Sequence, residues 1–177
     1  HGKTPLNKSI ISFDDFSEQL INLLNELKFS KIHLIGFSIG SLIARNFAVK
    51  YNERLKSLTL LASIFKRSEE QQKIVNDRFS LAKKNLKLSR QALKRWFSDK
   101  YLEKNPGTYE KISSILEKNN MENFLKVYEL FIFHKNNENF EKIKVNTLIM
   151  TGENDIGSTL DMSKKLCEVI NNSQLKV

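Results

Sequence analysis

The sequence is poor in the residues that cross-link or interrupt a chain. Its 177 residues include one cysteine, two prolines and six glycines. A single cysteine excludes an intrachain disulfide, and a reducing, cytoplasmic setting fits that composition. We interpret Cys167, which lies on an expected helix, as a small buried apolar residue rather than as a nucleophile. The low glycine and proline content argues against low-complexity or disordered segments.

Long apolar runs are missing as well. No stretch approaches the roughly 20 apolar residues that cross a bilayer, and the polar N-terminus lacks the apolar core of a signal peptide. The chain begins with His1, and residues 174–177 read as the opening of a strand. We therefore expect an internal fragment of a longer protein.

Acidic residues are outnumbered by basic ones, 20 against 29, which gives a net charge of +9. Many of the basic residues lie between residues 66 and 95, where they are spread around expected helices. A solvated surface is the simplest interpretation, although such a field would also favour a substrate that carries a carboxylate. A nucleic-acid partner is not expected because no recognisable binding module appears, and polyanion binding is a third alternative.

One short motif dominates what is present, Gly36-Phe37-Ser38-Ile39-Gly40. It lies between an apolar run at residues 32–35 and a segment with apolar residues at helical spacing. A strand, a sharp turn and a helix form the context that a G-x-S-x-G nucleophile motif requires. We expect glycines on both sides of the serine because neighbouring backbone comes close there. The alternative is a glycine-bounded turn in another α/β protein.

This context predicts two catalytic features at the motif. The Ser38 hydroxyl would be exposed on the turn, and the Ile39 amide would point from the helix N-terminus toward a developing oxyanion. A second apolar strand at residues 58–61 follows the helix. The resulting strand–helix–strand unit predicts two parallel strands, apolar on both faces and covered by helices.

Helices are also predicted before and after this unit. A helix begins after Ser12, with Asp15 completing a capping box, and its expected buried face comprises Phe16, Leu20, Leu23, Leu24 and Leu27. Four further helices are predicted at residues 69–86, 90–97, 108–118 and 121–133. The apolar run at 130–133 must be buried in a helical subdomain or line a substrate pocket. A strand at residues 145–150 follows, and then a helix with Leu160, Met162, Leu166, Val169 and Ile170 on its buried side.

These segments resemble the α/β-hydrolase fold superfamily. Residues 36–40 match its nucleophile elbow, residues 151–155 (Thr-Gly-Glu-Asn-Asp) look like its acid loop, and residues 1–4 look like the tail of the loop after its fourth strand. The resemblance implies an α/β fold with a partial, parallel hydrolase sheet that holds strands 5 to 7 and, at most, the start of strand 8. It implies core segments at 1–64 and 141–177 and a helical cap at 65–140.

The resemblance further implies a serine hydrolase that cleaves a carboxylic ester, lactone or thioester through a Ser-His-Asp triad and an acyl-enzyme. Ser38 would be the nucleophile, Ile39 the oxyanion donor and Asp155, rather than Glu153, the acid. Gly36, Phe37 and Gly40 would form the elbow. The acid loop looks most like those of carboxylesterases and 3-oxoadipate enol-lactonases, and no metal or organic cofactor is implied. The alternatives are a cofactor-free haloperoxidase or perhydrolase and a non-catalytic binding member of the same fold.

The family's catalytic histidine follows strand 8, and the sequence has no histidine after His134. We expect the base and the second oxyanion donor to lie outside this fragment, which would by itself be inactive. His33 is expected to be buried within its strand, His134 to be solvated at a helix end, and His1 to lie on a loop. None of the three is expected to act as the base. Asp155 also has a simpler interpretation, as a turn residue that caps the next helix.

Overall fold

The computed structural model describes residues 11–84 and 89–177. The expected loop at residues 1–4 and the expected end of the first cap helix at Leu86 therefore lie outside the described residues. The elements, in order, are α1 (Phe13–Glu26), β1 (Ile32–Phe37), α2 (Ile39–Lys50), the 3₁₀ turn η1 (Asn52–Arg54), β2 (Leu55–Leu61), α3 (Glu69–Lys83), α4 (Ser89–Trp96), α5 (Asp99–Lys104), α6 (Gly107–Glu117), α7 (Met121–Ile132), the 3₁₀ turn η2 (Phe140–Lys142), β3 (Thr147–Met150), α8 (Leu160–Val169) and β4 (Ser173–Lys176).

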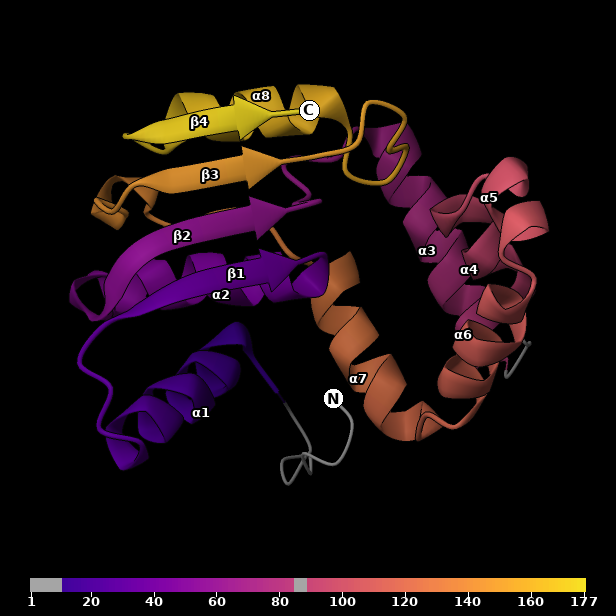
Figure 1. Cartoon of the computed structure of the whole chain (residues 1–177), viewed down its shortest axis with the longest axis horizontal. Helices are drawn as coiled ribbons and strands as arrows, with labels where there is room; N and C mark the ends of the chain where they lie inside the picture. The colour runs from indigo at the N-terminus through magenta and orange to yellow at the C-terminus, as the bar shows by residue number, and fades with distance from the viewer. Residues whose placement is uncertain (1–10, 85–88) are drawn as a thin grey trace. The chain divides into compact units, whose positions relative to one another are not determined.

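The four described strands form one parallel sheet in the order β1-β2-β3-β4 (Figure 1). The register aligns Phe37 with Leu61, Leu61 with Met150, and Met150 with Lys176. The carboxyl ends of all four strands therefore lie in one row. This arrangement confirms the predicted α/β class and the partial parallel sheet, including a last strand at the end of the sequence.

The helices of the sheet pack on one of its faces. Helix α2 packs against β1 and β2, α8 packs against β3 and β4, and α1 packs against α2. Right-handed crossovers between parallel strands that follow one another in order place α2 and α8 on the same face, behind the strands in Figure 1. The fully buried side chains of this core include Leu42, Phe47, Leu58, Leu60, Ile149 and Leu166.

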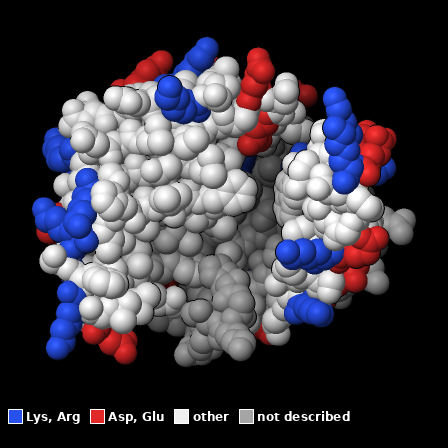
Figure 2. Space-filling model, viewed as in Figure 1, with Lys and Arg blue, Asp and Glu red and all other residues white. Residues whose placement is uncertain are grey.

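The opposite face of β1 is exposed in the described part of the chain, so the expectation that both faces are covered was wrong. Ile35 and Phe37 are 69% and 65% exposed. His33 on the same face is also exposed rather than buried, with Nδ1 2.7 Å from the Ser57 hydroxyl. The reason is that the described helices that contact the sheet pack on its other face, which the sequence of β1 alone does not reveal. Figure 2, in the same view, shows few charged side chains over the sheet.

Helix α1 confirms the predicted capping box. The Ser12 amide donates to Asp15 Oδ2 at 2.8 Å, and the Asp15 amide donates to Ser12 Oγ at 3.2 Å. The predicted buried face is partly wrong, because Leu23 and Leu27 are 48% and 51% exposed. The buried residues are Phe16, Ser17, Ile21 and Leu24. The helix packs mainly on α2, where the Ser17 hydroxyl donates to Asn46 Oδ1 at 2.6 Å, so its buried stripe includes a polar contact that hydrophobicity alone does not predict.

Helix α8 buries fewer residues than expected. Met162, Leu166 and Ile170 are buried, as predicted, whereas Leu160 and Val169 are half-buried. Cys167 is also half-buried rather than buried.

The described chain divides into two compact units. We call residues 11–70 and 134–177 the sheet unit and residues 71–133 the helical unit. The four predicted cap helices appear within a few residues of their expected bounds, but α5, with Ser98 as its N-cap, was not predicted. Of the apolar run at 130–133, Ile132 is fully buried and Phe133 is 56% exposed. None of the described helices is long and apolar enough to span a membrane.

Candidate active site

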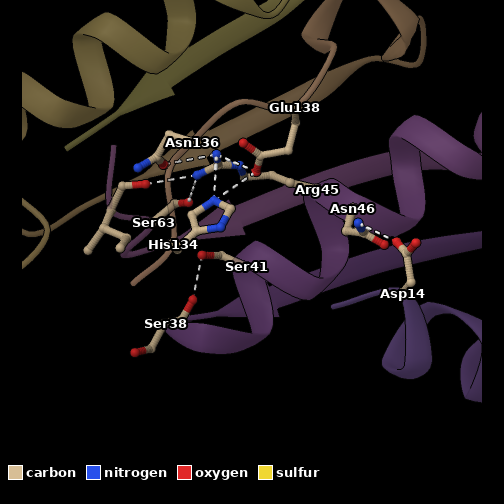
Figure 3. A network of polar contacts seen from close by, with 10 residues as sticks. Asp14, Ser38, Ser41, Arg45, Asn46, Ser63, His134, Asn136 and Glu138 are labelled. Atoms are coloured by element: carbon tan, nitrogen blue, oxygen red, sulfur yellow. Dashed lines mark hydrogen bonds and ion pairs between the residues drawn. The ribbon is translucent and has the colours of Figure 1, made fainter. Parts of the chain in front are cut away.

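Ser38 is the single residue between the end of β1 and the start of α2. Its φ of 54° and ψ of −122° are costly for a residue that carries a Cβ. The backbone is fixed on both sides, because the Ser38 amide donates to the Leu61 carbonyl at 3.0 Å and the Ser41 hydroxyl donates to the Ser38 carbonyl at 2.5 Å. The Ser38 hydroxyl does not cap α2, and in Figure 3 it points away from Ser41. The turn therefore presents a half-exposed serine hydroxyl on strained backbone.

The two glycines of the elbow differ. A Cβ at Gly36 would lie 2.7 Å from the Ser41 Cα and closer still to the Gly40 carbonyl oxygen, so this position excludes any side chain. A Cβ at Gly40 would meet no described atom within 4 Å. The expectation of close backbone contact is therefore confirmed for Gly36 and wrong for Gly40. Gly36 lies beneath the first turn of α2, whereas the Cβ direction of Gly40 points into open space.

The Ile39 amide is the first of helix α2. No hydrogen bond from this amide is found within the described residues, as is usual for the first amides of a helix. Such amides, together with the helix dipole, favour a negative charge at the N-terminus. The local structure therefore has a helix-terminal amide directly after Ser38, and its role as an oxyanion donor stays a prediction.

Asp155 lies on the loop between β3 and α8. Its Oδ1 accepts hydrogen bonds from the Gly157 and Ser158 amides at 2.8 and 2.9 Å, and no partner for Oδ2 is found among the described residues. The interpretation as a helix cap is wrong, because Thr159 caps α8 and accepts from the Met162 amide at 3.3 Å. Asp155 thus has one carboxylate oxygen fixed by the loop and a second oxygen for another partner.

The loop of Asp155 is attached to the ends of β2 and β3. The Ser158 hydroxyl donates to the Ala62 carbonyl at 2.9 Å, and the Thr151 hydroxyl donates to the Ser158 carbonyl at 2.7 Å. The Ala62 amide donates in turn to the Met150 carbonyl at 2.9 Å. Ser38 and the Asp155 loop therefore lie at the same edge of the sheet, at the carboxyl ends of parallel strands, where α/β proteins bind ligands.

The structure does not bring a histidine to either candidate residue within the described part of the chain. His33 pairs with Ser57 on the exposed face of β1. His134 is not solvated, as had been expected. Its side chain is 9% exposed, and its Nε2 lies 3.1 Å from Glu138 Oε1, while its ring packs edge to face on Phe13. Neither histidine has a hydrogen bond to Ser38 or Asp155.

A buried charge cluster beside the elbow was not predicted. Arg45 of α2 is fully buried, with Nη2 2.5 Å from Glu138 Oε1 (Figure 3). Burial lowers the pKa of Arg45 to about 10, against the opposing effect of Glu138, so the guanidinium stays charged at neutral pH. Burial also acts to raise the pKa of Glu138. The hydrogen bond from His134 and the charge of Arg45 outweigh this effect and hold that pKa below its ordinary value. An arginine on the apolar face of α2, between Leu42 and Phe47, was the available signal.

No group of three or more His, Cys, Asp or Glu side chains that could hold a metal ion is found in residues 11–84 and 89–177. The functional groups at the sheet edge are therefore a serine hydroxyl, a helix-terminal amide and a carboxylate. A strained serine turn between a parallel strand and a helix, with an acidic loop at the same sheet edge, is the strand–turn–helix context that the sequence motif predicts.

Comparison with known proteins gives the family. The model of the alpha/beta hydrolase fold family matches residues 1–177, and the chain belongs to this family. It is similar to (E)-2-((N-methylformamido)methylene)succinate hydrolase of Acinetobacter baylyi, with 26% identity over 92% of this chain and 62% of the relative. It is also similar to 3-oxoadipate enol-lactonase 2 of the same organism, with 23% identity over 100% of this chain and 66% of the relative.

Among solved structures, an esterase from Exiguobacterium antarcticum shares the fold. Its TM-score is 0.88 at 16% identity, over 100% of this chain and 69% of that one. The chain spans less than two thirds of the length of the two curated relatives.

Proposed function

We propose that the protein is a serine hydrolase that cleaves a carboxylic ester, lactone or thioester through an acyl-enzyme. The observation that carries the proposal is the strained turn at Ser38, whose hydroxyl has no hydrogen-bond partner among the described residues and is followed by the Ile39 amide. Two curated relatives are hydrolases by name, an enol-lactonase among them, which supports the reaction class.

In the proposed reaction the Ser38 oxygen attacks the substrate carbonyl and loses its proton to a base. The oxyanion of the tetrahedral intermediate accepts a hydrogen bond from the Ile39 amide. Collapse of the intermediate expels the alkoxide, enolate or thiolate, which takes up the proton from the protonated base, and leaves Ser38 acylated. Water, deprotonated by the same base, then releases the acid and restores the serine.

The proposed base is a histidine outside the described residues, oriented by Asp155. The amides of Gly157 and Ser158 fix Asp155 Oδ1, and Oδ2 is left to accept an imidazole N–H. A carboxylate in this role holds the base in the correct tautomer and stabilises the imidazolium that forms. A serine hydroxyl without such a base is a weak nucleophile at neutral pH.

A substrate that carries a carboxylate is the favoured class. The names of both curated relatives specify carboxylates, a substituted succinate and an oxoadipate enol-lactone. The net charge of +9 would attract an anion. Basic and acidic side chains are interspersed in the view of Figure 2, so we attribute the attraction to the overall field and not to one patch. The helical unit would act as the cap that selects the substrate, in a protein of the cytoplasm.

The decisive experiment compares ester hydrolysis by the complete natural chain and by its Ser38→Ala variant. The substrates are nitrophenyl butyrate and the nitrophenyl monoester of succinic acid. We expect kcat to fall by about 10³-fold or more in Ser38→Ala and by about 10²–10⁴-fold in Asp155→Asn. Ser57→Ala is the matched control, because this hydroxyl pairs with His33 on the exposed face of the sheet.

Equal rates for the unsubstituted protein and Ser38→Ala would contradict the hydrolase proposal and favour a non-catalytic binding protein. Bromination that depends on peroxide, in the absence of ester hydrolysis, would identify a perhydrolase instead. A kcat/KM for the succinate monoester no higher than that for the neutral ester would contradict the proposed carboxylate specificity alone.

A further inference from the structure

The buried guanidinium of Arg45, on helix α2, contacts two segments that lie far apart in the sequence. The outgoing connection, residues 62–68, follows β2 and leads to α3, and the returning connection, residues 134–139, follows α7 and leads to η2 and β3. Both connections belong to the sheet unit, at the points where the chain leaves and re-enters it. Arg45 contacts both of them from the helix that begins directly after Ser38.

The two terminal nitrogens of the Arg45 guanidinium contact different segments. Nη1 donates to the Ile64 carbonyl at 2.8 Å and lies 3.5 Å from the Ser63 hydroxyl, both in the outgoing connection. Nη2 donates to Asn136 Oδ1 at 3.1 Å and to Glu138 Oε1 at 2.5 Å, both in the returning connection. One planar group therefore joins two segments through residues, Ile64 and Asn136, that lie 72 positions apart in the sequence.

Aromatic rings from both sides complete the surroundings of the guanidinium. Its central carbon lies 4.9 Å from the ring centre of Phe140 and 5.9 Å from that of Phe65. The two rings pack edge to face at 5.7 Å and are both buried. Phe65 belongs to the outgoing connection, and Phe140 directly follows the returning one. The contacts of Arg45 thus include packing as well as hydrogen bonds.

The charged partner of the guanidinium is Glu138, and the His134 imidazole contacts both groups, with Nε2 3.5 Å from Arg45 Nη2 and 3.1 Å from Glu138 Oε1. Arg45 Nε and Glu138 Oε2 are buried without a hydrogen-bond partner among the described residues. Taking such a pair out of water is costly, so burial of the pair is weak evidence for stability. The geometry suits the positioning of the two connections, because a rigid, planar guanidinium can bind two segments at once. A lysine ammonium is a single point charge and cannot fix both segments in the same way.

We propose that Arg45 is a positioning residue that fixes the outgoing and returning connections to the helix of the nucleophile. The chain then leaves and re-enters the sheet unit at points set relative to Ser38. The expected effect of Arg45 on catalysis rests on the proposed function, in which the helical unit between the two connections contributes to substrate binding. Loss of the Arg45 guanidinium would therefore affect KM rather than kcat.

Hydrogen–deuterium exchange of the complete natural chain tests the structural part. We expect Arg45→Met to increase exchange at both connections by about tenfold or more, since each loses a buried hydrogen bond. Glu138→Gln keeps the shape of the side chain and the Ile64 contact, so exchange should rise in the returning connection only. Arg45→Lys should preserve the slow hydrogen exchange of at most one of the two connections.

Asn46→Ala is the matched control on the same helix. Asn46 Nδ2 donates to Asp14 Oδ1 at 2.9 Å, and its Oδ1 accepts from Ser17, so this residue joins α2 to α1 and contacts neither connection (Figure 3). Its substitution should raise exchange in α1 and leave residues 62–68 and 134–139 unchanged. The double variant Arg45→Met/Glu138→Leu removes both buried charges and should recover thermal stability without recovering protection of the connections.

Kinetics with the succinate monoester test the catalytic part. We expect Arg45→Lys to raise KM by about fivefold while kcat changes less than twofold. The proposal is overturned if Arg45→Met raises exchange equally in α1 and the strands, or if the double variant restores protection at both connections. It is also overturned if Arg45→Lys lowers kcat with KM unchanged. Full activity in Ser38→Ala would refute the hydrolase proposal and leave the exchange result valid.

Discussion

The sheet unit and the helical unit bury their side chains to different extents. In the sheet unit, Phe47 of α2, Leu60 of β2 and Ile149 of β3 are completely buried, and the strands are linked by hydrogen-bonded ladders. In the described part of the helical unit, the fully buried side chains are Ala82, Leu93 and Ile132, and α5 and α6 have no buried residue. Regions with little burial open locally at low free-energy cost. The candidate catalytic groups therefore lie on the firmly packed unit, and the elements proposed to select the substrate lie on the less firmly packed one.

The largest effect should come from adding a methyl group to the elbow of the sheet unit. In Gly36→Ala the new Cβ would meet the backbone of α2, which cannot move without breaking the turn. We expect a loss of about 5 kcal/mol or more in the free energy of unfolding, measured by urea denaturation, because overpacking against fixed backbone and strain act together here.

Gly40→Ala is the matched control for this substitution. Its Cβ meets no described atom within 4 Å, and alanine is the better helix former, so stability should rise by about 0.5–1 kcal/mol. Similar losses in the two variants would contradict the distinction that the structure draws between the two glycines.

The next effect compares one buried ring in each unit. Phe47→Ala removes a fully buried side chain of α2 and should cost about 3–5 kcal/mol. Phe79→Ala removes a ring that lies 5.8 Å from Tyr128 and 6.1 Å from Phe133, within the helical unit. We expect Phe79→Ala to raise hydrogen exchange in α3 and α7 and to leave β1–β4 protected, whereas Phe47→Ala should raise exchange throughout the sheet unit. Loss of protection in the strands of Phe79→Ala would show that the two units unfold together.

The smallest effect concerns a pair of charges at the surface of the sheet unit. The hydrogen bond from Asn46, followed by the contact with Lys50 at 3.1 Å, lowers the pKa of Asp14 from its ordinary value of 3.8. A carboxyl group with a lowered pKa in the folded state stabilises the fold above pH 3.8, and this contribution is lost as the pH falls through the lowered pKa. Because the Asp14 side chain is 56% exposed, the gain at pH 7 should be below about 1 kcal/mol.

Urea denaturation of Asp14→Asn and the unsubstituted protein checks this sign. The difference in unfolding free energy should be present at pH 7 and should shrink as the pH falls from 3.8 to 2, because protonation of the carboxyl removes its charge. A difference of the same size at both pH values would mean that the carboxylate charge does not contribute.

The sequence predicted local features better than burial. The elbow at Ser38, the capping box at Ser12 and the parallel strands follow from short patterns whose physics is local. The burial of His33 and Leu23 was predicted wrongly, because exposure depends on what packs against a strand or helix from elsewhere in the chain. The glycines of the motif looked equivalent, and only the three-dimensional path of α2 distinguishes them.

The contacts of Arg45 could not be predicted from local sequence patterns either. Its partners Ile64 and Glu138 lie 19 and 93 residues away in the sequence, so no local pattern joins them. His134 was assigned to solvent because its place at a helix end favours exposure, but the returning connection folds it against Glu138. The assignments of Ser38, Ile39 and Asp155 to catalytic roles, and of residues 65–140 to a cap, stay predictions.

The hydrogen bonds at the strand ends have a consequence for changes in chain length. The Ser38 amide is held by Leu61, the Ala62 amide by Met150 and the Thr151 amide by Lys176. Inserting one residue within β2 would therefore shift both the partner of the Ser38 turn and the anchor of the Asp155 loop, because side chains and carbonyls alternate along a strand. Insertions beyond these bonds, for instance in the loop between Gly152 and Asp155, leave that spacing unchanged. Natural or engineered variation in length should be confined to segments outside the row of strand ends.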